Sequence, residues 1–326
     1  MNDYTFRILG EGDLSEMNSL FEIAFNMEVK DNFLDWKYFL NPAGKAIIIG
    51  AFYQNKLVCS GAMVPTKMSV FGNIKTTYLH TDLMTHPEHQ RKGLAKRIGE
   101  LLIEHSKQTN TPFLYAIGAR LSTHIFLKNN WRLIGGMVNF FKPYFYLKLI
   151  KTFQSKKKST IQIHDSIAKH LDKFQFKIEP SKIKIDKTAD YLRWRTSNPN
   201  FAYKIICSYD KNNLVNGYLI YSIAKNNLIY VIDVENEPNN PTILKNLIDG
   251  VEREVIEYKY KGVVILTIKN SDFFNLIKNK YYFRNPFNKG PLKSFLDFTI
   301  YPYGEEVELI SAMKNWDILG LSYDDI

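Results

Sequence analysis

Residues 90–95 have the composition of an anion-binding turn. Their sequence is Gln-Arg-Lys-Gly-Leu-Ala, and a segment with helical periodicity follows. Gly93 permits a backbone conformation that residues with a Cβ resist, and Ala95 leaves room for a ligand at the first helical turn. Unpaired amides at a helix start, together with the positive end of its dipole, attract anions, and Arg91 and Lys92 add positive charge. We therefore expect this turn to bind a diphosphate.

A strand is expected to lead into the turn and a helix to leave it. Leu94, Ile98 and Leu102 are spaced by four residues, which places them on one apolar face of a helix. The apolar runs at residues 77–85 and 113–119 are typical of strands before and after this helix. The sequence therefore predicts a strand, a tight turn, a helix and a second strand around the anion site.

The sequence also repeats itself, weakly but in order. Residues 36–64, WKYFLNPAGKAIIIGAFYQNKLVCSGAMV, match residues 194–220, WRTSNPNFAYKIICSYDKNNLVNGYLI, as a Trp, an Asn-Pro pair and a predicted β-hairpin. Two further matches follow: residues 81–87 with 232–238, and residues 128–131 with 278–281. The displacement stays between about 150 and 157 residues, which indicates an internal duplication.

The duplication predicts an α/β fold of the α+β kind, with helices on a mixed, partly antiparallel sheet, present twice in tandem. We expect a first domain at residues 1–150 and a second at residues 151–326. In the second domain, Leu244 stands where the first has Gly93, and Pro241 removes an amide donor. The second domain is therefore expected to be degenerate, without a phosphate-binding turn.

Composition limits the classes of protein that fit. The chain has 326 residues, 45% of them hydrophobic, which suffices for two packed cores. Its two cysteines form neither a disulfide framework nor a CxxC motif, so we expect no metal site and a reducing, cytoplasmic location. The first residues lack a signal sequence, and no apolar run reaches the roughly 20 residues of a membrane helix.

The formal net charge of +10 has two interpretations. Much of it is scattered lysine, as at residues 156–158, so we interpret it as a solvated basic surface with no nucleic-acid partner. A nucleic-acid or anionic-membrane face is the alternative. Positive charge would also attract a polyphosphate cofactor.

Taken in order, these segments resemble the GNAT superfamily of N-acetyltransferases over most of residues 1–140. The V-x-P-x-x-[QR]-x-x-G-x-[GA] pattern of that family is matched at residues 85–95, with Thr in place of Val at residue 85. An aromatic-x-K-x-G-aromatic segment is approximated at residues 126–131. The resemblance implies an acyl-CoA site made by Leu83, Met84, Thr85, Gln90, Arg91, Lys92, Gly93, Leu94, Ala95 and Phe126. It also implies an amide near Leu83 or Met84 that stabilises charge on the thioester carbonyl.

The proton-transfer groups are less clear from the resemblance. Many relatives have a tyrosine that acts as general acid where this chain has Phe126, which has no proton to give. Strand alternation places His80, Asp82 and Met84 on one face, with neighbouring ionisable groups roughly 6 to 7 Å apart. His80 or Asp82 could take a proton from an attacking amine, and His124 could protonate the departing thiolate. A structural role is the alternative for each of these three residues.

The resemblance implies an N-acyltransferase that uses acetyl-CoA as co-substrate and acts on a small-molecule amine. The Trp-x-x-x-x-Asn-Pro segment and the divergent second half look like GNAT-like proteins linked to bacterial polysaccharide synthesis. That likeness suggests an amino sugar, free or nucleotide-linked, as the acceptor.

Two other functions remain open. One is a Fem-like peptidyltransferase that uses aminoacyl-tRNA; the basic charge favours it, and the intact CoA turn is against it. The other is a non-catalytic CoA-binding module, which the phenylalanine at residue 126 permits. The sequence gives neither the acyl length nor the oligomeric state.

Overall fold

The computed structural model describes residues 3–28, 30–118, 120–151, 161–165, 171, 174, 179–237, 240–269, 271–284 and 295–319. Lys156, Lys157 and Lys158 lie outside the described residues, as do Ala119 and Pro238 from the predicted strand and repeat. Among the described helices, none combines the length and the apolar character that crossing a membrane requires.

The N-terminal part of the chain forms the elements that the sequence predicts around the anion turn. They are β1 (Tyr4–Ile8), α1 (Leu14–Phe25), α2 (Phe33–Tyr38), β2 (Ile47–Tyr53), β3 (Lys56–Val70), β4 (Asn73–Thr85), α3 (Leu94–Ser106), β5 (Phe113–Gly118), α4 (Arg120–Lys128), β6 (Arg132–Pro143) and α5 (Tyr144–Lys151). Short 3-10 turns occur at η1 (Glu11–Asp13), η2 (Pro87–His89) and η3 (Lys107–Thr109).

The C-terminal part repeats the series helix, three strands, helix, strand, helix, strand. Its elements are β7 (Ile161–His164), β8 (Ile183–Ile185), α7 (Ala189–Thr196), β9 (Tyr203–Tyr209), β10 (Val215–Ile223), β11 (Leu228–Asn236), α8 (Pro241–Glu257), β12 (Gly262–Ile268), α9 (Asp272–Asn279), β13 (Phe295–Pro302), α10 (Val307–Ser311) and η4 (Met313–Asn315). The series from α7 to β13 matches the series from α2 to β6, as the duplication predicts.

Local sequence explains the hairpins of both copies. Gln54 and Asn55 join β2 to β3 with φ values of 48° and 63°, the left-handed conformation that a two-residue hairpin turn requires. In the second copy, Asn213 has a φ of 60° between β9 and β10. The predicted hairpins are therefore confirmed, and side chains that tolerate positive φ close them.

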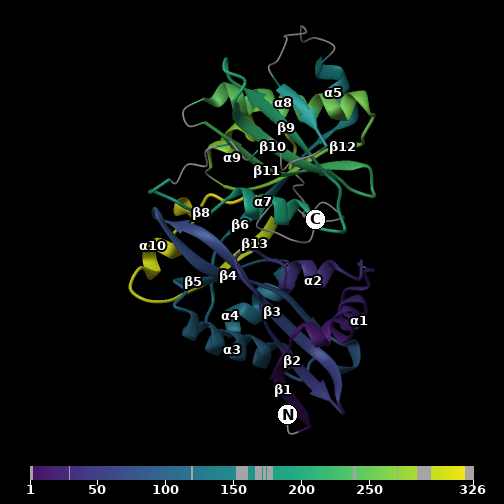
Figure 1. The fold of residues 1–326 in the computed structure, drawn as a ribbon, viewed down its shortest axis with the longest axis vertical. Helices are drawn as coiled ribbons and strands as arrows, with labels where there is room; N and C mark the ends of the chain where they lie inside the picture. The colour runs from purple at the N-terminus through teal and green to yellow at the C-terminus, as the bar shows by residue number, and fades with distance from the viewer. Residues whose placement is uncertain are drawn as a thin grey trace.

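The described strands join one mixed sheet, in the order β1-β2-β3-β4-β5-β13-β6-β12-β11-β10-β9-β7, with β8 paired to β3. The predicted mixed α/β sheet is confirmed. The order is the same from either end once each strand is replaced by its counterpart in the other copy. The last strands are exchanged: β13 from the second copy lies beside β5 of the first, and β6 lies beside β12. Figure 1 shows the C-terminal segment lying among the N-terminal strands.

The exchange bears on the predicted boundary at residue 150. That boundary remains a prediction, but no single cut in the sequence separates the two groups of strands, because β6 and β13 each pair mainly within the other copy's part of the sheet. The strands β6 and β13 also pair with each other.

The two copies share a hydrophobic core. It combines first-copy side chains with second-copy ones: Met68, Leu79, Phe113, Tyr115, Ile220, Ile232, Ile268, Leu296, Phe298 and Trp316. Two smaller cores cover opposite faces of the first copy's strands, one under α1 and α2 and one under α3 and α4. A fourth lies under α8 in the second copy.

Two tryptophans from the duplicated segments meet where α2 packs on α7. The indole Nε1 of Trp36 donates to the carbonyl oxygen of Trp194 at 2.8 Å, and Nε1 of Trp194 donates to the carbonyl oxygen of Trp36 at 2.9 Å. Their rings stack with centroids 4.9 Å apart. Such reciprocal contacts between equivalent residues are those of a two-fold interface, here formed within one chain.

Candidate active site

The turn between β4 and α3 has the backbone of an anion site. Gly93 is the N-cap of α3 and has a φ of 82°, a left-handed conformation that favours glycine. Arg91 also has a positive φ, 61°, which costs free energy in a residue with a Cβ and is a feature of functional turns. No side chain caps this helix start, and its first turn has no acidic residue. Arg91 and Lys92 are exposed beside it.

Beside this turn, the central strands of the first copy separate. Strands β4 and β5 pair in parallel at Tyr78 with Leu114 and at Leu79 with Tyr115, where their register ends. Strand β4 continues to Thr85, so the edge of β4 that faces β5 is unpaired within the sheet beyond Leu79. An extended ligand can add to such an edge as a further strand.

The second copy holds the equivalent strands together for longer. Strands β11 and β12 pair at four positions, from Leu228 with Gly262 to Val231 with Ile265. The helix that follows, α8, begins at Pro241, which has no amide hydrogen, and Asn240 makes no side-chain cap. The backbone of this copy therefore lacks the features that make the first copy's turn an anion site.

A β-bulge in β4 changes which side chains share a face. The register between β3 and β4 shifts at Gly61, opposite Asp82 and Leu83, and Asp82 has a φ of 50°. The prediction that His80, Asp82 and Met84 lie on one face is wrong. His80 packs on the α3 and α4 side, whereas Asp82 and Met84 face α1 and α2. Strict alternation fails because the bulge inserts one residue into the strand.

His80 is a buried imidazole in aromatic surroundings. It is 3% exposed, and its ring makes edge contacts with Phe126 at 4.9 Å and Trp131 at 5.7 Å between centroids. Neither ring nitrogen makes a hydrogen bond to another described residue. Burial lowers the pKa of His80 to about 4, so the ring is neutral at physiological pH. A buried polar group without a partner is uncommon and is a candidate for ligand contact.

Asp82 is held by two residues of α2 that the sequence analysis did not single out. Its Oδ2 lies 2.7 Å from the Lys37 ammonium and accepts a hydrogen bond from the Tyr38 hydroxyl at 2.7 Å. All three side chains are buried. The only sequence signal was a lysine inside the apolar helix FLDWKY, where a buried charge needs a partner. In the second copy, Asp233 is similarly paired with Lys187 at 2.8 Å.

The other predicted residues differ in accessibility. His124 is exposed on α4, and Phe126 is buried two residues further on. Met84 and Leu94 are buried, and Leu83, Thr85 and Ala95 are half-buried. Gln90, Arg91, Lys92 and Gly93 are exposed. The fold therefore brings together His80 and Phe126, and it keeps His124 away from the interior.

Cys59 is close to the site without being a nucleophile. Its Sγ lies 3.2 Å from the Thr85 Oγ1, and burial raises the pKa of the thiol to about 11. The thiol is therefore protonated at neutral pH, when a cysteine nucleophile must be a thiolate.

Comparison with known proteins identifies the class of this fold. Residues 5–134 match the model of the family described as acetyltransferase (GNAT) domain. This segment contains the separated strands, the Gly93 turn and α3. The first part of the chain is therefore a GNAT acetyltransferase domain, and the protein is an acyl-CoA-dependent acyltransferase. No curated protein sequence matches the chain.

Solved structures support the fold over nearly the whole chain. A tandem GNAT protein from the clavulanic acid biosynthesis pathway has a TM-score of 0.61 and 10% identity, covering 93% of this chain and 99% of that one. Saccharomyces cerevisiae N-myristoyltransferase with bound myristoyl-CoA has a TM-score of 0.61 and 11% identity, covering 94% and 80%. A GCN5-related N-acetyltransferase from Anabaena variabilis has a TM-score of 0.65 and 10% identity, covering 91% and 72%. The fold is that of two GNAT-like units in tandem.

Proposed function

We propose that this protein transfers an acetyl or closely related acyl group from acyl-CoA to a small-molecule amine, using only the first copy's cofactor site. The observation that supports this most directly is the uncapped start of α3 at Gly93, beside the point where β4 leaves β5. The amides of residues 90–95 bind the CoA diphosphate, and Arg91 and Lys92 add charge.

Strand β4 would supply binding and transition-state stabilisation. Its unpaired edge from His80 to Thr85 is available to hydrogen-bond with the pantetheine arm. An amide near Leu83 or Met84 then donates to the thioester oxygen as negative charge develops on it. Holding the thioester beside the amine supplies much of the rate.

Proton transfer is assigned to His80, Asp82 or His124, and the packing favours His80. Its ring contacts Phe126, which occupies the position of the tyrosine acid in many relatives, and its nitrogens have no other described partner. A neutral imidazole can donate a hydrogen bond to the departing thiolate. Asp82 is already engaged by Lys37 and Tyr38, so its contribution is to position β4 at the bulge.

The acceptor is a small amine, and an amino sugar, free or nucleotide-linked, is the first class to test. This choice rests on the resemblance of the Trp36 to Pro42 segment and of the divergent second half to polysaccharide-linked proteins. The shared core supports a role for the second copy in forming the acceptor site, because it fixes that copy against the strands that separate.

The first prediction concerns the cofactor turn. Gly93→Glu should abolish acetyl-CoA binding measured by isothermal titration calorimetry, because it adds a side chain to a residue at positive φ and places a carboxylate beside the diphosphate. Gly304→Glu is a matched control: Gly304 also has a positive φ, 72°, and a Cβ there would meet no atom within 4 Å. We expect this control to bind normally.

Leu244→Glu tests the second copy in the same assay. We expect unchanged affinity, since Leu244 lies in the first turn of α8, where Pro241 has no amide donor. Loss of binding in folded Leu244→Glu, with retention in Gly93→Glu, would show that the assignment of the active copy is wrong.

A further inference from the structure

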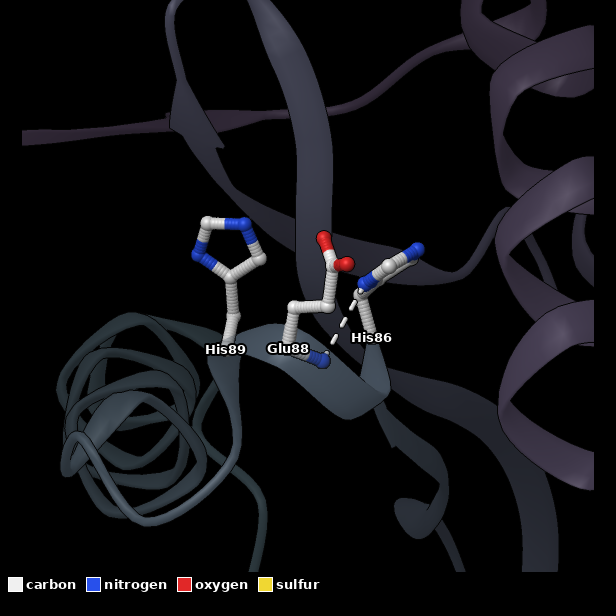
Figure 2. Close-up of side chains that lie close together, drawn as sticks. All are labelled: His86, Glu88 and His89. Atoms are coloured by element: carbon white, nitrogen blue, oxygen red, sulfur yellow. Dashed lines mark hydrogen bonds between the residues drawn. The ribbon is translucent and has the colours of Figure 1, made fainter.

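Three metal-ligating side chains meet on the 3-10 turn between β4 and the cofactor turn. They are His86, Glu88 and His89, and one ligand atom from each lies within 4.8 Å of the others. Figure 2 shows the Glu88 carboxylate between the two imidazole rings. The backbone explains the meeting: on a 3-10 turn, side chains three residues apart eclipse one another, and His86 and His89 have this spacing.

The surroundings of His89 resemble those of a metal-bound imidazole. The Tyr4 hydroxyl of β1 lies 2.9 Å from His89 Nδ1, which leaves Nε2 as the ligand atom. The rings of Tyr4 and Tyr53 contact the imidazole, with centroids 5.8 and 5.1 Å away. In metal sites, a hydrogen bond to the second nitrogen sets the tautomer and orients the ring.

His86 and Glu88 need only small adjustments to act as ligands. The Nδ1 of His86 accepts a long hydrogen bond, 3.4 Å, from the Glu88 amide, which a metal ion can displace. A tetrahedral zinc ion places its nitrogen ligands roughly 3.3 Å apart, given Zn–N distances of about 2.0 Å. Side-chain rotations therefore have to close a gap on the order of 1 Å, and Glu88, which is exposed, is free to move.

We propose that His86, Glu88 and His89 bind one divalent ion of the late first-row series, such as Zn²⁺, with a position left open to solvent. Two imidazoles and one carboxylate form a donor set that zinc uses in sites with an open position, and imidazole favours these metals over Mg²⁺ and Ca²⁺. This proposal does not depend on acyl transfer. It departs from the expectation of no metal site; the sequence signal was His-Pro-Glu-His, which a search for cysteine motifs does not detect.

The test uses full-length protein without an affinity tag and without CoA. Isothermal titration with Zn²⁺, and the visible absorption of bound Co²⁺, should both report one site. His86→Ala, Glu88→Gln and His89→Ala should each weaken Zn²⁺ binding by at least 10-fold, and Tyr4→Phe should weaken it by about 10-fold, the effect typical of an outer-shell partner. Mg²⁺ should not compete.

His105→Ala is the matched control, because it removes a histidine from the last turn of α3, away from the cluster. It should bind Zn²⁺ as the wild type does. Thermal unfolding of each variant without metal establishes that it is folded. Absence of a Zn²⁺ site in the wild type, or equal affinity in folded His86→Ala and His89→Ala, would overturn the proposal.

Discussion

At the scale of single residues, His80 is the group whose environment most departs from the ordinary. Its burial beside Phe126 and Trp131 disfavours the charged ring and lowers its pKa to about 4, against an ordinary value near 6.5. Between these two pH values the unfolded chain binds a proton at this site and the folded chain does not. The contribution of His80 to stability is therefore fully present above pH 6.5 and is lost as the pH falls toward 4.

His80→Phe is the prediction at this scale, because it keeps a ring and removes both nitrogens. The wild type should lose about 2 kcal/mol of unfolding free energy between pH 7 and pH 5 that the variant keeps, measured by urea unfolding. Turnover with acetyl-CoA should fall by about 10²-fold while acetyl-CoA affinity is unchanged. His124→Ala is the comparison: parallel pH curves for His80→Phe and wild type, or a turnover loss confined to His124→Ala, would contradict the assignment.

At the scale of elements, the contact between α2 and α7 holds the two copies in register. The reciprocal hydrogen bonds of Trp36 and Trp194 satisfy two carbonyl groups near the helix ends, and the stacked rings cover each other. Trp36 also lies 5.7 Å from the Arg195 guanidinium. Because each indole depends on the other for its geometry, their energies should be coupled.

A double-mutant cycle on this pair is the prediction at the element scale. Trp36→Phe and Trp194→Phe should each destabilise the protein by about 1–3 kcal/mol, since each removes one donor and leaves a carbonyl oxygen without its partner. The double variant should lose less than the sum by at least about 0.5 kcal/mol. Trp131→Phe paired with Trp194→Phe is the control, because Trp131 packs within the first copy, and that pair should be additive. Strict additivity for Trp36 and Trp194 would contradict the coupling.

At the scale of the whole molecule, the exchanged strands make the two copies one folding unit. Strand β13 pairs along both sides, with β5 and with β6, and its side chains Leu296, Phe298 and Ile300 belong to the shared core. Without it, the edge of β5 and a large part of that core are open to solvent. An unpaired hydrophobic strand edge promotes aggregation.

A fragment of residues 1–150 is therefore expected not to fold by itself. It should show no cooperative unfolding transition in urea and should be digested rapidly by protease, although it contains the whole cofactor turn. Co-expression with residues 151–326 is the control, because that fragment contains β13 and should restore a folded complex that binds acetyl-CoA. A monomeric 1–150 fragment that unfolds cooperatively and binds acetyl-CoA would show that the exchange is dispensable.

The sequence by itself determined the local elements and the cofactor turn. Hairpin turns, the apolar face of α3 and the left-handed Gly93 depend on residues within a few positions of each other, so periodicity and turn chemistry predict them. The duplication was visible for the same reason, because each copy retains its own local signals. The class of fold and the copy that carries the cofactor turn followed from these patterns.

Only the tertiary structure decided the exchange of β6 and β13, the faces of β4 and the pairing of Asp82 with Lys37. Strand β5 has an apolar pattern that either β6 or β13 can satisfy, so the choice depends on contacts between residues far apart in the chain. The bulge at Asp82 shifts the alternation by one residue, and it accompanies a buried carboxylate that meets an ammonium from another element. Periodicity along one segment contains no information about such partners.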